Sequence, residues 1–482
     1  MRRALNVIEN GGNPQITSLT GHPYDHPYFG WLFLAGLLSA VGYPYSLQPS
    51  SEGDIESIEK LYLVPRLIVG VLAIVDTFLI YKIAERRYHS RDIAVTASIL
   101  FSVTPLTWLI RGVFLDTILL PLLLASILFA LHLENPMRDN YIRNGNYNNN
   151  RINLSVRNIS VIVFSGILLG LAIFTKIPIF TMIPLVGFLI YTNSNRNLKA
   201  LGIWLIPVLL IPAIWPAHAM YSGDLDMWKD DILWQATERP SQSLFYSIEY
   251  FFKTDPILFI LGLVGMIYAA TNKNIMILLW AIPFLIFLYL IGYVAFFHLN
   301  PLLPLLCVAA AVMVVELSRK IISAKNFRQR VLVSSGIIVA IAISQLITTI
   351  TLVIVDENSL HLKTVAFLSS IIPGNTQIMA DPATKLTIVG PSKYFWTAQS
   401  VFDKDMNDYT AHGSIGNVRT DRAILVVDGA MVEVMEKQTK SGGYLRSLYN
   451  NSELVTRIQG EYGRDQYGQL EIRMANSNRS QN

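Results

Sequence analysis

Charged side chains stand at the ends of long apolar runs in this 482-residue chain. Arg111 and Asp116 flank the start of one run, Lys176 closes a later run, and His298 precedes a third. Ionisable groups are rare beside apolar segments of membrane-spanning length, and they mark functional sites there more often than elsewhere. Cations and a carboxylate together can bind an anion and move a proton, so we treat these residues as site candidates.

Each of these residues also has a structural interpretation. Arg111 and Lys176 can extend along the apolar surface and place their charges at a membrane interface. Asp116 can stabilise the start of a helix, where anions are favoured. His298 alone is typical of an interfacial polar residue. The sequence leaves both interpretations open for each position.

Residues 21–30 add a second group of candidates, in the order Gly-His-Pro-Tyr-Asp-His-Pro-Tyr-Phe-Gly. Asp25 and His26 are its titratable centre. The two His-Pro pairs can instead serve only to shape a rigid turn, because proline fixes its own backbone angle and restricts the residue before it.

Ten apolar runs approach the length of a membrane-spanning helix, which needs roughly 20 mostly apolar residues. They cover 62–82, 93–110, 113–133, 158–175, 177–194, 200–220, 256–272, 275–294, 298–317 and 331–355. A shorter apolar run at 28–44 predicts an interfacial helix, with Trp31 and Tyr43 at the level of the lipid headgroups. The sequence therefore predicts an all-α polytopic membrane protein.

The loops between these runs set the expected orientation. The loops after the first, third, fifth, seventh and ninth runs hold 16 Lys and Arg residues. Basic loops stay in the cytoplasm, so the alternate loops and both termini are expected outside it. All the candidate residues then lie on the non-cytoplasmic side of a cell membrane.

The tail has a different composition, because 27 of the 72 charged residues fall in 356–482. Runs typical of strands lie at 386–389, 423–427 and 469–473, and runs typical of helices at 431–438 and 444–449. This mixture predicts a small extracytoplasmic α/β domain. We therefore expect three parts: a loop with an interfacial helix in 1–61, a transmembrane domain in 62–355 and the α/β domain in 356–482.

Some partners are unlikely on composition alone. The net charge of +4 is dispersed and forms no basic patch interleaved with aromatic residues, which argues against nucleic acid as a partner. Cys307 is the single cysteine, so no intrachain disulfide can form. The histidines are scattered and form no metal-ligand motif, although a bound divalent cation stays possible and the cofactor is unknown.

The candidate motifs, in this order, resemble those of the GT-C superfamily of glycosyltransferases that use polyprenyl-phosphate sugars. The most similar branch is that of the protein O-mannosyltransferases and aminoarabinose transferases. Arg111-x-x-x-Leu-Asp116 is similar to that family's motif at the start of a span, and the segment from Gly166 to Lys176 resembles its span that ends in lysine. Residues 25–30 resemble a His-Pro-Pro-Leu-Gly stretch, and His298 resembles the start of a late motif. The resemblance covers about residues 4–320.

The resemblance implies transfer of a sugar from a polyprenyl-phosphate donor to an acceptor hydroxyl on a protein, lipid or glycan. Four residues are then expected to bind the donor: Arg111, Lys176, His298 and His26. The family's catalytic Asp-Glu pair precedes a stretch like residues 4–12, after a first transmembrane helix. We therefore expect a longer parent chain, or Asp25 as the substitute base, with Asp116 orienting Arg111 or a sugar hydroxyl.

Trp228 and Trp234 lie in the long loop 221–255 and are expected to contact sugar, since aromatic faces suit sugar rings. An amphipathic interfacial helix is an equal explanation of this loop. Two other functions stay open. An inactive scaffold or accessory subunit would agree with the missing acidic pair. A transporter is disfavoured, because no internal repeat is evident and the charges cluster at the external ends of the runs.

Overall fold

A computed structural model gives the fold of the chain. It describes residues 2–10, 22–47, 55–109, 112–133, 156–237, 243–291, 294–321 and 327–354, and parts of the tail between 360 and 476. The chain divides into two compact units. The helical unit comprises 22–33 and 66–349, and the second unit comprises 1–21, 34–65 and 350–482.

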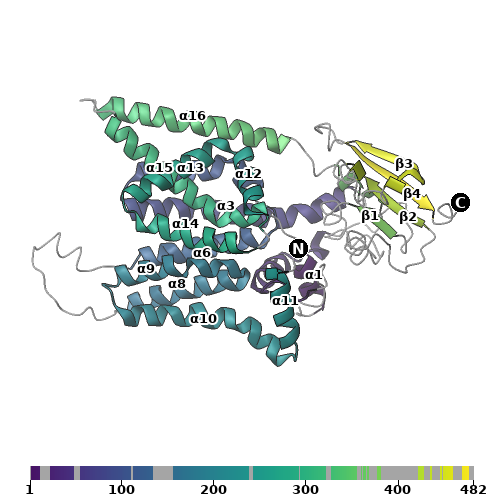
Figure 1. The fold of residues 1–482 in the computed structure, drawn as a ribbon, viewed down its shortest axis with the longest axis horizontal. Coiled ribbons are helices and arrows are strands. Elements are labelled where there is room, and N and C mark those ends of the chain that lie inside the picture. Colours follow the sequence, from purple (N-terminus) through teal and green to yellow (C-terminus); the bar gives the residue numbers. More distant parts are fainter. Residues whose placement is uncertain are drawn as a thin grey trace, which may run out of the picture. The chain divides into compact units, whose positions relative to one another are not determined.

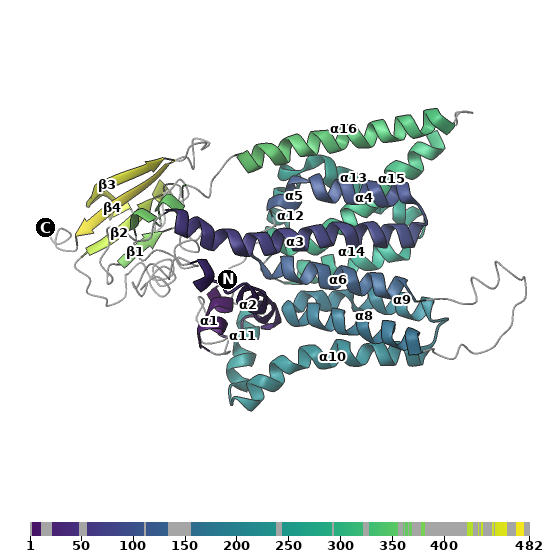
Figure 2. The same cartoon turned by 180° about the vertical axis from the view of Figure 1, so that it is seen from behind.

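Long helices lie side by side in the helical unit, with α16 at one edge and α10 at the other (Figures 1 and 2). The α-helices and 3-10 helices (η) of this unit are α2 Phe29–Ala40, α3 Ile55–Tyr88, α4 Arg91–Val103, α5 Pro105–Leu109, α6 Leu115–Leu131, α8 Val156–Thr175, η2 Ile177–Met182, α9 Ile183–Asn193, α10 Leu198–Tyr221, α11 Leu225–Thr237, α12 Leu244–Thr254, α13 Pro256–Thr271, α14 Ile275–Leu290, η3 Phe296–Leu302, α15 Leu303–Ile321 and α16 Phe327–Ile354. Helices α2, α3 and α16 run on into the second unit. Each of the ten predicted runs coincides with helix, which confirms the predicted fold class.

Several of these helices are shorter than the apolar runs that predicted them. Six helices in the described part of the chain are long and apolar enough to cross a membrane, or seven if the bent pair α12–α13 is one span. The second predicted run is interrupted at Thr104, since Pro105 begins a new helix. Helices α6, α9 and α14 are apolar but have 17, 11 and 16 residues. At about 1.5 Å per residue, they fall short of a bilayer core of about 30 Å.

Small residues bring the helix backbones close together. A Cβ atom on Gly166 of α8 would lie 2.5 Å from the Trp204 carbonyl oxygen of α10, and one on Gly170 would lie 2.7 Å from the Pro207 carbonyl oxygen. Such small-xxx-small faces allow close helix packing where lipid provides no hydrophobic driving force. On another face of α8, Ser165 exchanges hydrogen bonds with Ser126 of α6, each hydroxyl donating to the other residue's carbonyl oxygen at 2.8–2.9 Å.

A buried carboxylate fixes the bend between α12 and α13. Asp255 is 3% exposed and accepts hydrogen bonds from the Leu258 N–H at 2.9 Å and the Thr104 hydroxyl at 2.6 Å. The amide of Gln345 on α16 donates to the same carboxylate at 2.8 Å. One side chain therefore caps α13 and anchors the peripheral helix α16 to the bundle.

The second unit contains α1 Arg2–Asn10, the 3-10 helix η1 Tyr45–Leu47 and a four-stranded sheet. Its strands are β1 Gln377–Ala380, β2 Arg422–Val427, β3 Ser452–Gln459 and β4 Gln469–Asn476, in the order β1-β2-β4-β3 (Figure 1). β1 and β2 are parallel, and the other pairs are antiparallel. The predicted strands at 423–427 and 469–473 are confirmed, while the run at 386–389 lies outside the described residues.

Tyr43, predicted to lie at the level of the lipid headgroups, is buried in the second unit. Its side chain is 1% exposed, and its hydroxyl group donates to the Leu61 carbonyl oxygen at 2.9 Å. Trp31 in the helical unit is also buried. Both rings pack within the protein, and their position at the level of the lipid headgroups stays a prediction. Whether the 28–44 segment lies at an interface stays a prediction, since residues 29–47 are also counted among the six helices long and apolar enough to cross a membrane.

The stability of the sheet is expected to depend on pH through the Glu471 carboxylate. Glu471 on β4 accepts hydrogen bonds from the Tyr449 hydroxyl and from the guanidinium groups of Arg457 and Arg473, at 2.9–3.1 Å. Burial alone raises the pKa of Glu471, but the three donors outweigh it, so its pKa lies below the usual value. The carboxylate therefore stabilises the sheet above the pKa of the unfolded chain, about 4.3, and this contribution is lost as pH falls further.

We expect Glu471→Gln to remove much of the loss of stability that the wild-type sheet shows as pH falls below about 5. Hydrogen exchange of the β4 amides in the full chain, corrected for intrinsic rates, measures this. Glu453→Gln on β3 is the control, because residue 453 is exposed. Equal pH dependence in wild type and Glu471→Gln would contradict the assignment.

Candidate active site

Asp116 and Lys176 form a buried ion pair, with 2.6 Å between the Lys176 Nζ and an Asp116 oxygen. Asp116 lies in the first turn of α6, and Lys176 follows the last residue of α8. The Lys176 backbone is extended, and Pro178 then lies at the start of η2, so the chain leaves α8 at this point. Since α6 and α8 pack together, the start of one and the end of the other meet at the same end of the bundle.

The ion pair is shielded from solvent, because the Lys176 and Asp116 side chains are 7% and 4% exposed. Removing two charges from water costs several kcal/mol per ion, which the mutual attraction only partly offsets. A lysine that merely extends to the membrane surface would not be buried beside a carboxylate. The geometry therefore argues against the snorkelling interpretation of Lys176.

Two stacked aromatic rings, Phe297 and Phe114, lie beside the ion pair. The Lys176 Nζ lies 5.1 Å from the centre of the Phe297 ring, and Phe297 stacks on Phe114 with 5.0 Å between ring centres. The next residue, His298, accepts a hydrogen bond at Nδ1 from the Ala295 N–H at 3.1 Å. An accepting Nδ1 carries no proton, so the proton of the neutral imidazole is on Nε2. The start of α6, the end of α8 and η3 thus bring three predicted residues to one end of the helical unit.

The segment 22–30 reaches the same place through Gly30. A Cβ atom at Gly30 would lie 2.6 Å from Leu115 Cδ2 and 2.9 Å from Thr175 Cγ2. Leu115 and Thr175 directly precede Asp116 and Lys176 in the sequence. The first turn of α2 therefore packs against the residues that hold the ion pair, and a larger residue at position 30 would require the Leu115 and Thr175 side chains to move.

Asp25 and His26 lie five and four residues before Gly30, so the Asp25 Cα is within about 18 Å of the Gly30 Cα. The Asp25 carboxylate lies 3.5 Å from the His26 Nδ1, and their side chains are 13% and 22% exposed. The amide of Gln235 on α11 donates to the Asp25 carbonyl oxygen at 2.9 Å. Asp25 is thus a partly accessible carboxylate on an anchored segment.

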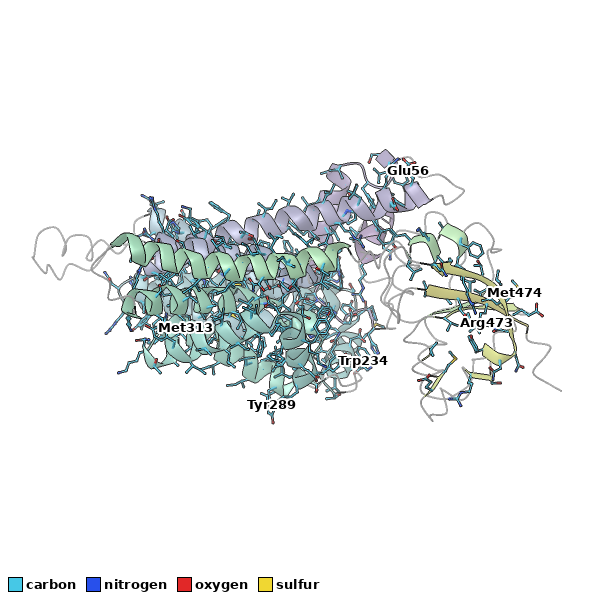
Figure 3. All side chains as sticks on the ribbon, turned by 90° about the horizontal axis from the view of Figure 1, so that it is seen from above. Glu56, Trp234, Tyr289, Met313, Arg473 and Met474 are labelled. Atoms are coloured by element: carbon cyan, nitrogen blue, oxygen red, sulfur yellow. The ribbon has the colours of Figure 1, made fainter. Side chains whose placement is uncertain are left out.

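The two tryptophans predicted to contact sugar lie on α11. Trp234 stacks on His22, with 3.9 Å between ring centres and 19° between planes. Trp228 packs edge-on against Trp215, at 5.6 Å and 80°. Figure 3 shows Trp234 at one end of the helical unit and Met313 of α15 toward the other end. Both indoles have packing roles in this structure, and sugar contact by either stays a prediction.

Comparisons with known proteins bear on this arrangement. A family model described as dolichyl-phosphate-mannose-protein mannosyltransferase matches residues 23–215. A comparison with curated proteins gave no match. ArnT from Cupriavidus metallidurans, solved with bound undecaprenyl phosphate, is similar over 98% of this chain and 92% of that chain, with a TM-score of 0.53 and 12% identity. The archaeal oligosaccharyltransferase AglB from Archaeoglobus fulgidus, solved with an inhibitory peptide and a dolichol-phosphate, is similar over 99% of this chain and 69% of that chain, with a TM-score of 0.54 and 12% identity. The chain has the GT-C fold.

The family match covers only part of the candidate site in this GT-C fold. It includes Asp25, His26, Asp116 and Lys176, whereas His298 lies beyond it. Arg111 falls within the match but outside the residues that the structure describes. Across the described ranges, no group of three or more His, Cys, Asp and Glu residues is arranged to hold a metal ion.

Sequence reasoning missed three buried carboxylates of this GT-C fold, namely Asp76, Asp231 and the Asp255 that caps α13. Asp76 is 2% exposed on α3. A carboxylate within this apolar run indicates a candidate functional residue, so Asp76 could have been identified from the sequence. Asp231 is 4% exposed on α11 and binds the segment 22–24. Its neighbours Asp226, Lys229 and Asp230 make α11 look like an ordinary solvated helix, so the sequence gave no comparable signal for Asp231.

Proposed function

We propose that this chain is a membrane glycosyltransferase that moves a sugar from a polyprenyl-phosphate donor to an acceptor hydroxyl on the non-cytoplasmic side. The observation that carries this proposal is the buried Asp116–Lys176 pair at the end of α6 and α8 in a GT-C fold. ArnT was solved with undecaprenyl phosphate and AglB with a dolichol-phosphate, so two proteins of similar fold bind polyprenyl phosphates. The matching family model makes a dolichyl-phosphate hexose, and mannose first, the donor to test.

The reaction needs a positive charge beside the leaving group. The acceptor oxygen attacks the anomeric carbon, the bond from that carbon to the phosphate oxygen breaks, and the electron pair leaves with the polyprenyl phosphate. Lys176 is our candidate cation for this developing negative charge, because an ammonium group has three donors. It can contact Asp116 and a phosphate oxygen together. Asp116 then orients Lys176. We assign Arg111 to the same phosphate, as the sequence predicts.

The proton of the acceptor hydroxyl must also be removed. Asp25 is our candidate base, because it is a partly exposed carboxylate on the segment that leads to Gly30. His298, next to Phe297, is our candidate for a donor to a phosphate or sugar oxygen through its Nε2–H. His26 and the outer face of Trp234 remain proposed contacts for donor and sugar.

Competition binding tests the phosphate half of this proposal. The purified full chain is offered a labelled polyprenyl phosphate, with the unlabelled phosphate or the uncharged polyprenol of the same length as competitor. We expect the phosphate to compete at least about tenfold better, because a charge-assisted contact contributes about 1.5–3 kcal/mol. Equal competition by the polyprenol would show that the protein binds only the lipid tail and would contradict the proposal.

A further inference from the structure

Asp231 connects α11 to a segment more than 200 residues away. One carboxylate oxygen lies 2.7 Å from the His22 Nδ1, and the other accepts the Tyr24 N–H at 2.7 Å. The Asp231 side chain is 5% exposed. A buried carboxylate is costly unless its oxygens are satisfied, and here both are satisfied by the segment 22–24. The bond to a backbone N–H also fixes the register of that segment.

Other residues of α11 and its N-terminal flank contact the same segment. Gln235, four residues after Asp231 and therefore on the same helix face, donates to the Asp25 carbonyl oxygen. Trp234 stacks on the His22 ring. The Tyr24 hydroxyl donates to Asp224 at 2.9 Å. Burial and the adjacent Asp224 and Asp231 raise the pKa of Tyr24 well above its usual value, so this phenol stays a neutral donor at physiological pH.

The anchored segment continues directly into the candidate active site. Pro23 and Pro27 restrict its backbone, and Tyr28 packs against Phe174 with 4.9 Å between ring centres. Gly30 then meets the residues next to Asp116 and Lys176. Between its anchor on α11 and its anchor at Gly30, this segment carries only Asp25 and His26 as titratable side chains besides Tyr28.

We infer that Asp231 is a positioning residue, which holds the segment 22–28 so that the Asp25 carboxylate is presented to the acceptor hydroxyl beside the Asp116–Lys176 pair. This inference rests on the proposed function. Asp231 does not touch substrate in this account, and its effect on the reaction passes through the His22 and Tyr24 contacts. It should therefore affect the chemical step more than donor binding, which depends on Lys176.

Asp231→Asn is the test, measured in the purified full chain with dolichyl-phosphate-mannose and an acceptor. The amide keeps the shape of the side chain but can accept at only one of its two positions. We expect kcat to fall about 10- to 100-fold, as for a misplaced catalytic group, while KM for the donor changes less than about twofold. Asp226→Asn is the matched control on the same helix, because the Asp226 side chain is 93% exposed. We expect it to be indistinguishable from wild type.

Hydrogen exchange gives a second readout that needs no activity. Exchange in residues 22–28 should rise at least about tenfold in Asp231→Asn, with α6 and α8 unchanged, because either His22 or the Tyr24 amide loses its acceptor. If Asp231→Asn does not fold, Gln235→Met removes one contact to the same segment and should show smaller changes in the same direction.

An unchanged kcat in folded Asp231→Asn would overturn the inference, whatever the exchange shows, and so would a loss confined to donor KM. A wild-type chain that transfers no sugar would contradict the proposed function and the catalytic half of this inference. The exchange measurement would still decide whether Asp231 holds the segment, so the two failures can be told apart.

Discussion

Lys176→Met is expected to lower the rate of sugar transfer by about 100- to 1,000-fold, the range found when one group that stabilises developing negative charge is removed. The variant keeps the length of the side chain and loses the ammonium group that lies 2.6 Å from Asp116. The transfer rate is measured with a polyprenyl-phosphate sugar in excess of the chain. Lys176→Arg keeps the charge, so it should retain part of the activity even though the fork geometry differs.

The single variant also leaves Asp116 buried without its cation, which costs about 3–5 kcal/mol of stability. The double variant Asp116→Leu/Lys176→Met replaces both charges by apolar groups, and such replacements are often neutral or stabilising by about 1–4 kcal/mol. We therefore expect the double variant to unfold at a temperature near that of wild type and to remain inactive. Wild-type transfer by a folded double variant would show that the ion pair is only structural.

The second large effect is expected on stability, at the contact between α13 and α15. A Cβ atom on Gly265 would lie 2.4 Å from the Ala309 carbonyl oxygen and 2.5 Å from its carbonyl carbon. These are backbone atoms, so the helices must separate to admit even a methyl group. Gly265→Ala is expected to destabilise the helical unit by about 1–3 kcal/mol or more, because overpacking cannot be relieved by a side-chain rotation.

Thermal unfolding in one detergent measures this effect. Gly202→Ala in α10 is the matched control, since no heavy atom lies within 4 Å of the Cβ position there. That substitution removes the helix-breaking tendency of glycine and should be neutral or stabilising by up to about 1 kcal/mol. Similar unfolding temperatures for the two alanine variants would contradict the close contact between α13 and α15.

The sequence predicted the helices well because their apolar runs follow from the thickness of a membrane. It overestimated their length where a proline or a polar residue ends a helix inside an apolar run. Thr104, before Pro105, divides α4 from α5 in this way. In the tail, β3 was missed because it has no alternation of buried apolar and exposed polar residues: Leu454 and Val455 are exposed, and its one buried residue is Ser452. Only its pairing with β4 shows it to be a strand.

Part of the site could be predicted from the sequence because of the order of the spans. Asp116 begins one span and Lys176 ends the next, so two antiparallel neighbours must bring them to the same side. No such rule joins His22 to Asp231, which are 209 residues apart and meet only through tertiary packing. The contact between His22 and Asp231 could therefore be found only from the structure.

Release of polyprenyl phosphate is the most direct test of the account. The purified full chain is given a panel of polyprenyl-phosphate hexoses that includes dolichyl-phosphate-mannose, together with a peptide that contains serine and threonine. Mass spectrometry follows the donor and the acceptor. If the chain is a glycosyltransferase, one donor is converted to free polyprenyl phosphate and one hexose is added to an acceptor hydroxyl. We expect Asp116→Leu/Lys176→Met to give neither product. Donor that binds to the wild-type chain and stays intact across the whole panel would contradict the proposed function.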